Sequence, residues 1–539
     1  MADGVIQDST AVHGGGDFYT RKATGLVREM SARDMFVMTV VYISIIFGLL
    51  TISIIPFAFP GANIPLSITL TGVIALFPVL LYAFFTAAMP RTGGDFIFVG
   101  RVLHPILGFM ANWNMTVWVI FFQGIQGGWI VGTGFSSLFF ALSITTGSST
   151  LLNFAIALQH PWPRFIGSMI VLAIIGWGLA RGFRSLMRVT YVLFILMLIG
   201  LAIGIITALL TSSAQLDSSL VQYHTSRAAL TAAANHAGYP TQSGFSWLAT
   251  LASFPLMWAV LGFSQVSAYT AGEIRSPRRN ALVAMVGSVV FATVVFAVTG
   301  WAVARFAGND FMGAMETLFQ TGVKAYPFPI EPTVYFYPTI THGTILAIFI
   351  WSAFIIGGFL TIPASLLVVT RNVFAWSFDR ILPASLASVD DKFHAPRNAV
   401  IAVVLLVAVC SAVFIFGPSN FTTFAFSGAA GQMLTFILVA IAGIAFAYRR
   451  RDLHDSSPYH GRLLGIPIFT WLGVISLAMF VSYFILLMTN SALGANAPVG
   501  IWSIVVIMVL GGVVYGASYF VNKRRGVDLL MGQRELPPE

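Results

Sequence analysis

Polar residues interrupt an apolar stretch of the chain between residues 258 and 280, which reads WAVLGFSQVSAYTAGEIRSPRRN. Gly262, Ser264 and Gln265 lie near the middle of this stretch. Inside a membrane, a glycine and two polar side chains are costly unless they face protein or a water-filled cavity. Secondary transporters place their binding sites at helices that are broken in this way. The stretch therefore predicts a broken helix with a small-molecule site.

A second candidate break lies between Ser44 and Thr51, which reads SIIFGLLT and has Gly48 as its only glycine. The N-terminal end of a half-helix can hold a carboxylate, and the carbonyl-rich end of another can hold an ammonium group. Two such breaks could bind the zwitterion that α-amino acids share. Amides in a span usually face the bundle interior, either for helix packing or for a pathway. The candidate substrate-binding residues are Ser44, Phe47, Gly48, Thr51, Gln123, Gln126, Trp258, Gly262, Ser264 and Gln265.

Three carboxylates, Asp95, Glu273 and Asp379, lie beside arginines in connections between apolar runs. If these connections meet at one face of the molecule, ion pairs between them could hold that face shut. Solvated surface charges are the alternative, and such pairs are often worth only about 0–1 kcal/mol. The candidate gate residues are Asp95, Glu273, Arg371 and Asp379.

The composition places the chain in a membrane. Hydrophobic residues make up 57% of its 539 residues, charged residues make up 9%, and the mean hydropathy is +0.87. Soluble globular proteins are far less apolar. The net charge of +9 is spread over short basic groups between apolar runs, which argues against a nucleic-acid partner. Cys410 is the only cysteine, so an intramolecular disulfide or a cysteine-based zinc site is excluded.

Twelve apolar runs are long enough for helices of about 20 residues that cross a bilayer. With the N-terminus inside, 24 of the 28 Lys and Arg residues fall on the inner side, so the positive-inside rule predicts a multi-pass cell-membrane protein with both termini cytoplasmic. The longer external connections, near 212–244 and 307–341, are expected to form short helices over the entrance. The runs lie near 35–58, 62–88, 104–142, 165–180, 186–211, 245–270, 281–306, 342–376, 397–416, 421–447, 466–489 and 500–521.

The spacing of these runs indicates an internal repeat. The starts of the first five runs and of the next five are offset by roughly 210 to 238 residues, and the two units begin on opposite sides. We predict an all-α integral membrane fold with a five-plus-five inverted repeat, broken first and sixth helices and two extra C-terminal helices. A chance agreement of hydropathy periods is the alternative. The expected segments are 1–33 (cytoplasmic arm), 34–211 (first repeat), 212–244 (external loop), 245–448 (second repeat), 449–521 (last two helices) and 522–539 (cytoplasmic tail).

Three motifs resemble those of the amino acid, polyamine and organocation (APC) permeases of the amino acid permease type. EIRSPRRN at residues 273–280 looks like the E-x-K-N-P-x-R run that closes the sixth helix of that family. MPRTGGD at residues 89–95 is similar to the family's P-x-S-G-G loop, and RNVFAWSFDRILP at residues 371–383 resembles the end of its eighth helix. The motifs occur in the right order on one predicted side, and the resemblance covers residues 18 to 520, roughly.

The resemblance implies the inverted-repeat transporter fold and an aromatic lid over the substrate at Trp258. A packed tryptophan is the alternative in a chain with 12 Trp and 47 Phe. The first break departs from the family's G-S-G or G-x-G pattern, because Gly48 stands alone. The apolar neighbours of Gln123 and Gln126 favour a neutral or apolar amino acid as the substrate.

The coupling ion stays open between Na⁺ and H⁺, and no cofactor is expected. The assigned spans place no Asp, Glu, Lys or Arg at mid-membrane depth, so a buried proton carrier is not evident. Sodium needs oxygen ligands, which Thr361 and Ser365 could supply together with first-span carbonyls. Hydroxyls that bond back to their own helix are the alternative, and exchange without an ion also stays open. The expected partners are the substrate and membrane lipid, with the chain as a monomer or homodimer.

Rival functions have weaker support in the sequence. Polyamines or other small amines are disfavoured because buried carboxylates are not evident, whereas a non-transporting amino acid sensor on the same fold stays open. A membrane enzyme needs clustered His, Asp or Glu, but the nine histidines are scattered. A channel is expected to have pore loops or rings of charge, and neither is visible. We therefore predict a secondary transporter of amino acids and no enzymatic activity.

Overall fold

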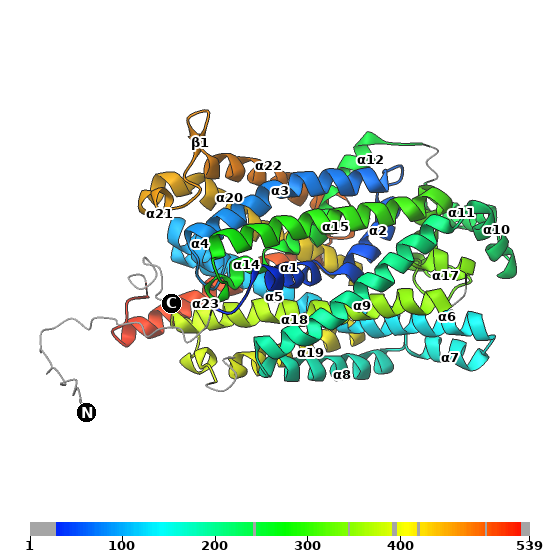
Figure 1. The fold of residues 1–539 in the computed structure, drawn as a ribbon, viewed down its shortest axis with the longest axis horizontal. Helices are drawn as coiled ribbons and strands as arrows, with labels where there is room; N and C mark the ends of the chain where they lie inside the picture. The colour runs from blue at the N-terminus through cyan, green and yellow to red at the C-terminus, as the bar shows by residue number, and fades with distance from the viewer. Residues whose placement is uncertain are drawn as a thin grey trace, which may run out of the picture.

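The computed structural model describes residues 28–240, 244–342, 345–390, 396–417, 421–490 and 493–529. Within these residues, eleven helices are long and apolar enough to cross a membrane. Helices α1 (Ala32–Tyr42) and α2 (Ile45–Ala58) form one further span with a 40° bend, which gives twelve. The prediction of an all-α protein with twelve spans is confirmed, and most of the long helices run along one common direction (Figure 1).

The other spans follow α1 and α2 in chain order. The second to sixth are α3 (Ile64–Ala88), α5 (Pro105–Trp129) continued by the π-helix η1 (Ile130–Phe135) and α6 (Ser136–Thr146), α8 (Pro161–Ala180), α9 (Phe183–Leu210), and α12 (Trp247–Ala252), α13 (Phe254–Leu261), η2 (Gly262–Ser264) and α14 (Val266–Tyr269) together. The seventh to twelfth are α15 (Pro277–Ala307), α18 (Ile345–Phe378), α19 (Arg397–Phe416), α20 (Phe421–Arg449), α22 (Ile468–Thr489) and α23 (Pro498–Arg524).

Short elements connect these spans. They are α4 (Asp95–Val102), α7 (Ser149–Ala157), α10 (Ser213–Gln222), α11 (Arg227–His236), η3 (Ala271–Glu273), α16 (Asn309–Thr321), α17 (Phe336–His342), η4 (Ala384–Ala387), α21 (Arg451–Asp455) and the hairpin of β1 (Arg462–Leu463) with β2 (Ile466–Pro467). The third and eighth spans contain 42 and 34 residues, far more than a bilayer requires, as the lengths of their apolar runs predicted.

The outer helices turn large apolar side chains away from the protein. In α19, Ile401, Leu405, Val409 and Val413 are more than half exposed and follow one another at the four-residue spacing of a single helix face. The opposite face of α19, which includes Val403, is buried against the bundle. A fully apolar outer face is unfavourable in water but matches hydrocarbon, so this pattern fits a helix at the lipid boundary.

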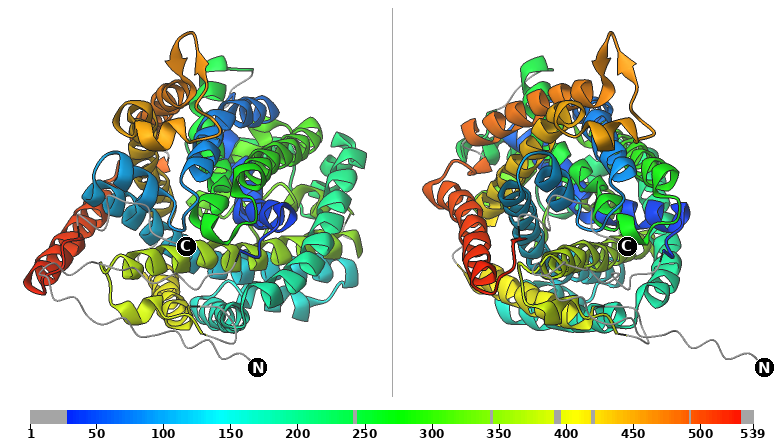
Figure 2. Two further views of the ribbon diagram at one scale, coloured as in Figure 1. Left: turned by 60° about the vertical axis from the view of Figure 1, so that its left-hand side comes forward. Right: turned by 90° about the vertical axis from the view of Figure 1, so that its left-hand side faces the viewer.

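The broken sixth span lies in the interior of the bundle. All eight residues of α13 are buried, whereas four of the twenty residues of α8 are buried. Figure 2 shows the helices as a ring around this interior when the molecule is viewed along its long axis. Interior helices can lose regular backbone bonds because neighbouring protein groups and enclosed water replace them.

The first span breaks at Ile43 and Ser44, at the beginning of the predicted segment Ser44–Thr51. Ser44 adopts φ 62° and ψ 91°, and its side chain accepts a hydrogen bond from the Phe47 N–H. Gly48, the only glycine of that segment, lies inside α2 and does not interrupt the helix. A Cβ atom at that position would lie 2.2 Å from Cζ of Phe296, so the glycine allows α15 to pack closely.

The sixth span breaks where the sequence predicted. Gly262–Ser264 forms a single 3₁₀ turn in which Phe263 has ψ 31°, and Gln265 follows with ψ 20°. The chain then forms one short turn of helix, α14, before it reaches Glu273. Both the first and the sixth span are therefore interrupted, as expected for corresponding members of two repeats.

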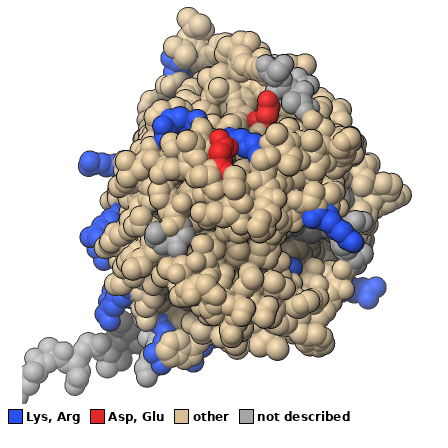
Figure 3. Space-filling model, turned by 90° about the vertical axis from the view of Figure 1, so that its right-hand side faces the viewer, with Lys and Arg blue, Asp and Glu red and all other residues tan. Residues whose placement is uncertain are grey.

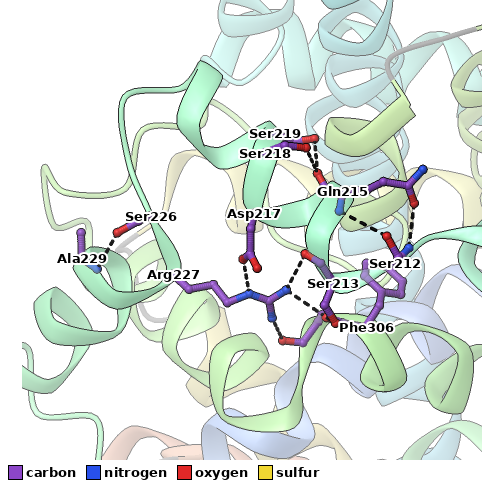
Figure 4. A network of polar contacts seen from close by, with 11 residues as sticks. Ser212, Ser213, Gln215, Asp217, Ser218, Ser219, Ser226, Arg227, Ala229 and Phe306 are labelled. Atoms are coloured by element: carbon purple, nitrogen blue, oxygen red, sulfur yellow. Dashed lines mark hydrogen bonds and ion pairs between the residues drawn. The ribbon is translucent and has the colours of Figure 1, made fainter.

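Short helices cover the end of the bundle opposite to the end at which α1 begins and α23 ends (Figure 1). These ends are termed the distal end and the termini end. The predicted connections near 212–244 and 307–341 contain α10, α11, α16 and α17. Arg227 of α11 pairs with Asp217 of α10 at 2.6 Å and donates to the Phe306 carbonyl at 3.0 Å, which fixes both helices to the last turn of α15 (Figure 4).

The arm before α1 is attached to the end of the sixth span. The Met30 N–H donates to the Glu273 carbonyl at 2.9 Å, and the Arg275 N–H donates to the Met30 carbonyl at 2.9 Å. Most of the predicted arm 1–33 and the second half of the predicted tail 522–539 lie outside the described residues.

Candidate functional site

Two ion pairs are buried at the termini end. Arg371 of α18 holds Glu273 in a bidentate pair, with Nε–Oε1 at 2.6 Å and Nη2–Oε2 at 2.9 Å. Arg101 of α4 pairs with Asp379, just after α18, at 3.1 Å. All four side chains are at most 7% exposed, so these charges are not solvated. The pairs join the end of the sixth span and α4 to α18 and to the residue that follows it.

Asp95 is held by hydroxyl groups at the same end. The hydroxyls of Tyr82 on α3 and Tyr269 on α14 each donate to its carboxylate at 2.6 Å. Burial raises the pKa of Asp95 to about 6, and the two hydroxyls partly offset this rise. The preceding Gly94 has φ 50°, and a Cβ atom there would lie 2.5 Å from the Tyr269 ring. The glycine therefore allows α4 to begin directly against the sixth span.

Amides of the third span divide into two groups. Asn112 accepts a hydrogen bond from Trp376 Nε1 at 2.8 Å, and Asn114 donates to the Gly431 carbonyl at 2.8 Å, so both join helices. Gln123 and Gln126 lie further along α5 and are 4% and 3% exposed. Within the described part of the chain, Oε1 of Gln123 and Nε2 of Gln126 have no hydrogen-bond partner.

The break in the sixth span carries a third unsatisfied amide. Gln265 is 2% exposed, and neither of its terminal atoms has a partner among the described residues. Buried polar groups in proteins are nearly always hydrogen-bonded, to protein or to water. Unsatisfied amides on both a broken helix and the neighbouring α5 therefore indicate a place where water or a ligand binds.

Aromatic rings connect the two breaks. The Phe263 ring, in the sixth span, lies 5.3 Å from the Tyr42 ring at the end of α1 and 6.2 Å from the Phe122 ring of α5. Phe47, in the first turn of α2, lies 5.9 Å from Phe122 and stacks on Trp129 at 5.7 Å. Both breaks and the α5 face that carries Gln126 therefore share one apolar surface.

A cavity of about 400 Å³ lies on the distal side of Phe47 and Trp129. Its volume is within the range of small-molecule sites. Figure 3 shows the distal face, on which charged side chains are few and lie mostly toward the edges. The lining consists of Phe47, Leu50, Ile54, Phe57, Trp129, Gly132, Thr133, Gln159, Arg164, Phe319, Gln320, Glu331, Phe414, Ile415, Gly417 and Phe426.

Two acidic residues of the distal connections lie near this cavity, Glu316 buried and Glu331 half-buried. Glu331 lies between α16 and α17 and accepts a hydrogen bond from Thr133 at 3.4 Å. Glu316 of α16 is 1% exposed and accepts a bond from Gln320 at 2.7 Å. Burial raises the pKa of both glutamates, and the charge of Glu331 raises the pKa of Glu316 further. Both lie in a connection that hydropathy assigns to the exterior; the apolar neighbours of Glu331 in FPIEPTVYFY are the only sequence signal of its burial.

Two broken spans beside a cavity of small-molecule size are features found in secondary transporters. The chain matches the model of the amino acid permease family over residues 34–512. It belongs to that family. It is therefore a multi-pass membrane transporter of amino acids or related organic cations, and not an enzyme. The comparison with curated proteins found no significant match.

Several predicted ligand residues of this permease lie away from the cavity. Trp258 is 2% exposed and packs against Phe436 and Phe480, with ring centroids 5.4 and 5.2 Å away. In this structure Trp258 is therefore a packed tryptophan, the alternative to a lid over the substrate. Gly262 lies directly beneath its indole ring. Thr51 donates to the carbonyl of Phe47, inside α2. Phe47 is the one predicted residue that lines the distal cavity as described.

The residues proposed for sodium lie next to the first break of the permease. Thr361 of α18 donates to the Val41 carbonyl at 3.0 Å and to its own helix at Gly357 at 2.9 Å. Ser365, one turn later, is 1% exposed. Across the described residues, no three His, Cys, Asp or Glu side chains gather into a metal site. The Thr361 hydroxyl thus bonds both to its own helix and to a first-span carbonyl, and sodium binding here stays a prediction.

Proposed function

We propose that the permease is a secondary active transporter that moves neutral or apolar amino acids across the cell membrane by alternating access, with both termini cytoplasmic. The observation that carries this proposal is the opposition of a buried, ion-paired termini end to a hollow distal end, with both helix breaks between them. Alternating access requires such a state and its inverse.

The breaks offer groups for both charges of an amino acid. The first turn of α2 has N–H groups without intrahelical acceptors, which favour a carboxylate, although the Ser44 side chain already occupies the Phe47 N–H. The carbonyl end of α13 favours an ammonium group. Gln126 and Gln265 would donate or accept hydrogen bonds with the polar backbone groups of the substrate. Phe47 and Phe263 would contact its apolar side chain.

Coupling to Na⁺ or H⁺ belongs to this proposal. A sodium ion at Thr361 would take the place of the hydroxyl proton at the Val41 carbonyl, with Ser365 as a neighbouring ligand. A proton would instead use the distal glutamates, Glu316 and Glu331, which the apolar surroundings hold partly protonated near neutral pH. The dependence of transport on each ion separates the two.

Counterflow in proteoliposomes tests the function without a driving gradient. Vesicles loaded with unlabelled amino acids should accumulate a labelled neutral amino acid, and the Gln265→Leu variant should lower this accumulation at least about tenfold, because a buried hydrogen bond to a polar ligand is lost. Gln222→Leu, an exposed change on α10, is the matched control and should leave it unchanged. Folded protein that shows no counterflow but binds amino acids would be a sensor and would contradict the transport proposal.

Small amines are the second candidate. The sequence disfavoured them because buried carboxylates were not evident, but Glu316 is buried, and Glu331, in the cavity wall, is half-buried. The counterflow panel therefore includes putrescine and spermidine. Accumulation of these amines, with none of any amino acid, would favour the second candidate over the first.

A further inference from the structure

Arg164 reaches the distal cavity from the first turn of α8. Its side chain lies over two glycines of the third span: a Cβ atom at Gly132 would be 2.7 Å from its Nε, and one at Gly128 would be 3.4 Å from Nη2. The guanidinium carbon is 5.3 Å from the centre of the Phe414 ring, which also lines the cavity. Two glycines and the π-helical turn of η1 thus make the space that this side chain fills.

Glu331 lies in the wall of the same cavity. One of its oxygens accepts the long Thr133 bond, and its side chain is half-buried, because it faces the cavity. Gln159 supports this wall by donating to the carbonyl of Pro329, two residues before Glu331, and to Ser136 at 3.0 Å. The Glu331 carboxylate therefore lies on a segment that Gln159 holds in place, and it faces the cavity.

The two charges act on each other without forming an ion pair. The positive charge of Arg164 lowers the pKa of Glu331 against the larger effect of burial, yet no ion-pair contact joins them within the described residues. At the termini end, by contrast, Arg371 and Glu273 touch in a bidentate pair. Opposite charges that stay apart in a poorly solvated cavity carry a desolvation cost that no direct contact offsets. A ligand group of the opposite sign at each charge would offset this cost.

We propose that the distal cavity is a second amino-acid site, an outer station that lies before the helix breaks, in which Arg164 binds the α-carboxylate and Glu331 binds the α-ammonium group. The apolar lining, including Phe319 and Phe426, receives an apolar side chain. Phe47 and Trp129 form the wall toward the breaks. The inference rests on the proposed function, and it selects zwitterions: a polyamine would place positive charge beside Arg164, and a simple acid would place negative charge beside Glu331.

Charge-deleted ligands test this assignment. Equilibrium binding of leucine, of 3-methylbutylamine, which lacks the carboxylate, and of 4-methylpentanoate, which lacks the ammonium group, is measured on the full chain in nanodiscs. The wild type should prefer leucine to both analogues by about tenfold or more, as expected for charge-assisted hydrogen bonds. In the Gln265→Leu background, which removes the contribution of the proposed central site, Arg164→Gln should abolish only the preference for leucine over 3-methylbutylamine. In the same background, Glu331→Gln should abolish only the preference for leucine over 4-methylpentanoate. Arg164→Lys should restore part of the first preference.

Two further variants separate this site from the central one and from misfolding. Lys324→Gln, an exposed cation of the distal end, should change none of the preferences. Gln265→Leu should keep leucine binding with the same charge selectivity, because the outer station lies apart from the sixth-span break. Loss of all binding in Gln265→Leu, or an equal change for all three ligands in Arg164→Gln and Glu331→Gln, would overturn the proposal. If only the outer-station proposal is wrong, the wild type still shows counterflow of amino acids. If the proposed transport function is wrong, the wild type shows no counterflow.

Discussion

The charged side chains at the two ends of the permease differ in whether they contact one another. At the termini end, Glu273 and Asp379 each contact an arginine directly, and no more than 7% of any of these side chains is exposed. At the distal end, Arg164 and Glu331 face a cavity without touching. Contacts between buried charges hold helices together, whereas separated charges leave a vacancy that suits a charged ligand. The comparison therefore supports the proposal that the termini end is closed in this state and that ligand enters from the distal end.

The largest expected effect is at the sealed end. Arg371→Gln leaves the Glu273 carboxylate buried without its bidentate partner, which should cost about 3–5 kcal/mol and lower the thermal unfolding midpoint in detergent. The double variant Glu273→Gln, Arg371→Gln should recover much of this loss, because no uncompensated charge remains. Arg279→Gln, an exposed change at the same end, is the control. Equal midpoints for Arg371→Gln and Arg279→Gln would show that the pair does not close this end.

Trp258 and Phe47 provide the next test, because one is packed and the other lines the cavity. Trp258→Ala should destabilise the protein by about 3–5 kcal/mol, since it removes a large ring that packs against both Phe436 and Phe480. Any folded fraction should keep its KM for counterflow. Phe47→Ala should instead raise KM at a smaller cost in stability. A raised KM for folded Trp258→Ala would restore the lid interpretation.

A pH-dependent effect is expected from the distal glutamates. Burial raises the pKa of Glu316, so the folded state binds this proton more tightly than the unfolded state does. Its contribution to stability is therefore present at low pH and is lost as the pH rises above the ordinary glutamate pKa of 4.5 toward the raised value. Glu316→Gln should flatten the fall of the unfolding midpoint over this window. The exposed Asp217→Asn should not, and an unchanged slope in Glu316→Gln would mean that this carboxyl group does not titrate there.

The smallest expected effect concerns sodium. Thr361→Val removes a hydroxyl that bonds the Val41 carbonyl and leaves the shape of α18 nearly unchanged, so stability should fall by about 1 kcal/mol. If sodium binds here, the Na⁺ concentration for half-maximal transport should rise, while transport that needs no sodium should not respond. An identical sodium dependence in Thr361→Val and the wild type would assign this hydroxyl to helix packing.

The sequence by itself determined the features that depend on local pattern. Apolar runs of bilayer length fixed the twelve spans, and the polar cluster from Gly262 to Gln265 located the break in the sixth span. The acidic and basic residues of the gate motifs were identified from their spacing. The sequence did not show which carboxylate pairs with which arginine. The pairs Glu273–Arg371 and Asp379–Arg101 are contacts between segments that are distant along the chain.

Only the tertiary structure decided which way side chains of these segments face. Within the predicted segment Ser44–Thr51, the first span is interrupted at Ser44, and Gly48 lies inside α2 where α15 packs closely. Trp258 turns toward Phe436 and Phe480, although its sequence position also suited a lid. Glu316 is buried and Glu331 is half-buried because the connection that contains both residues folds back over the cavity. The physical reason is common to all of these: periodicity and hydropathy are properties of neighbours along the chain, whereas burial and pairing depend on which distant helices meet.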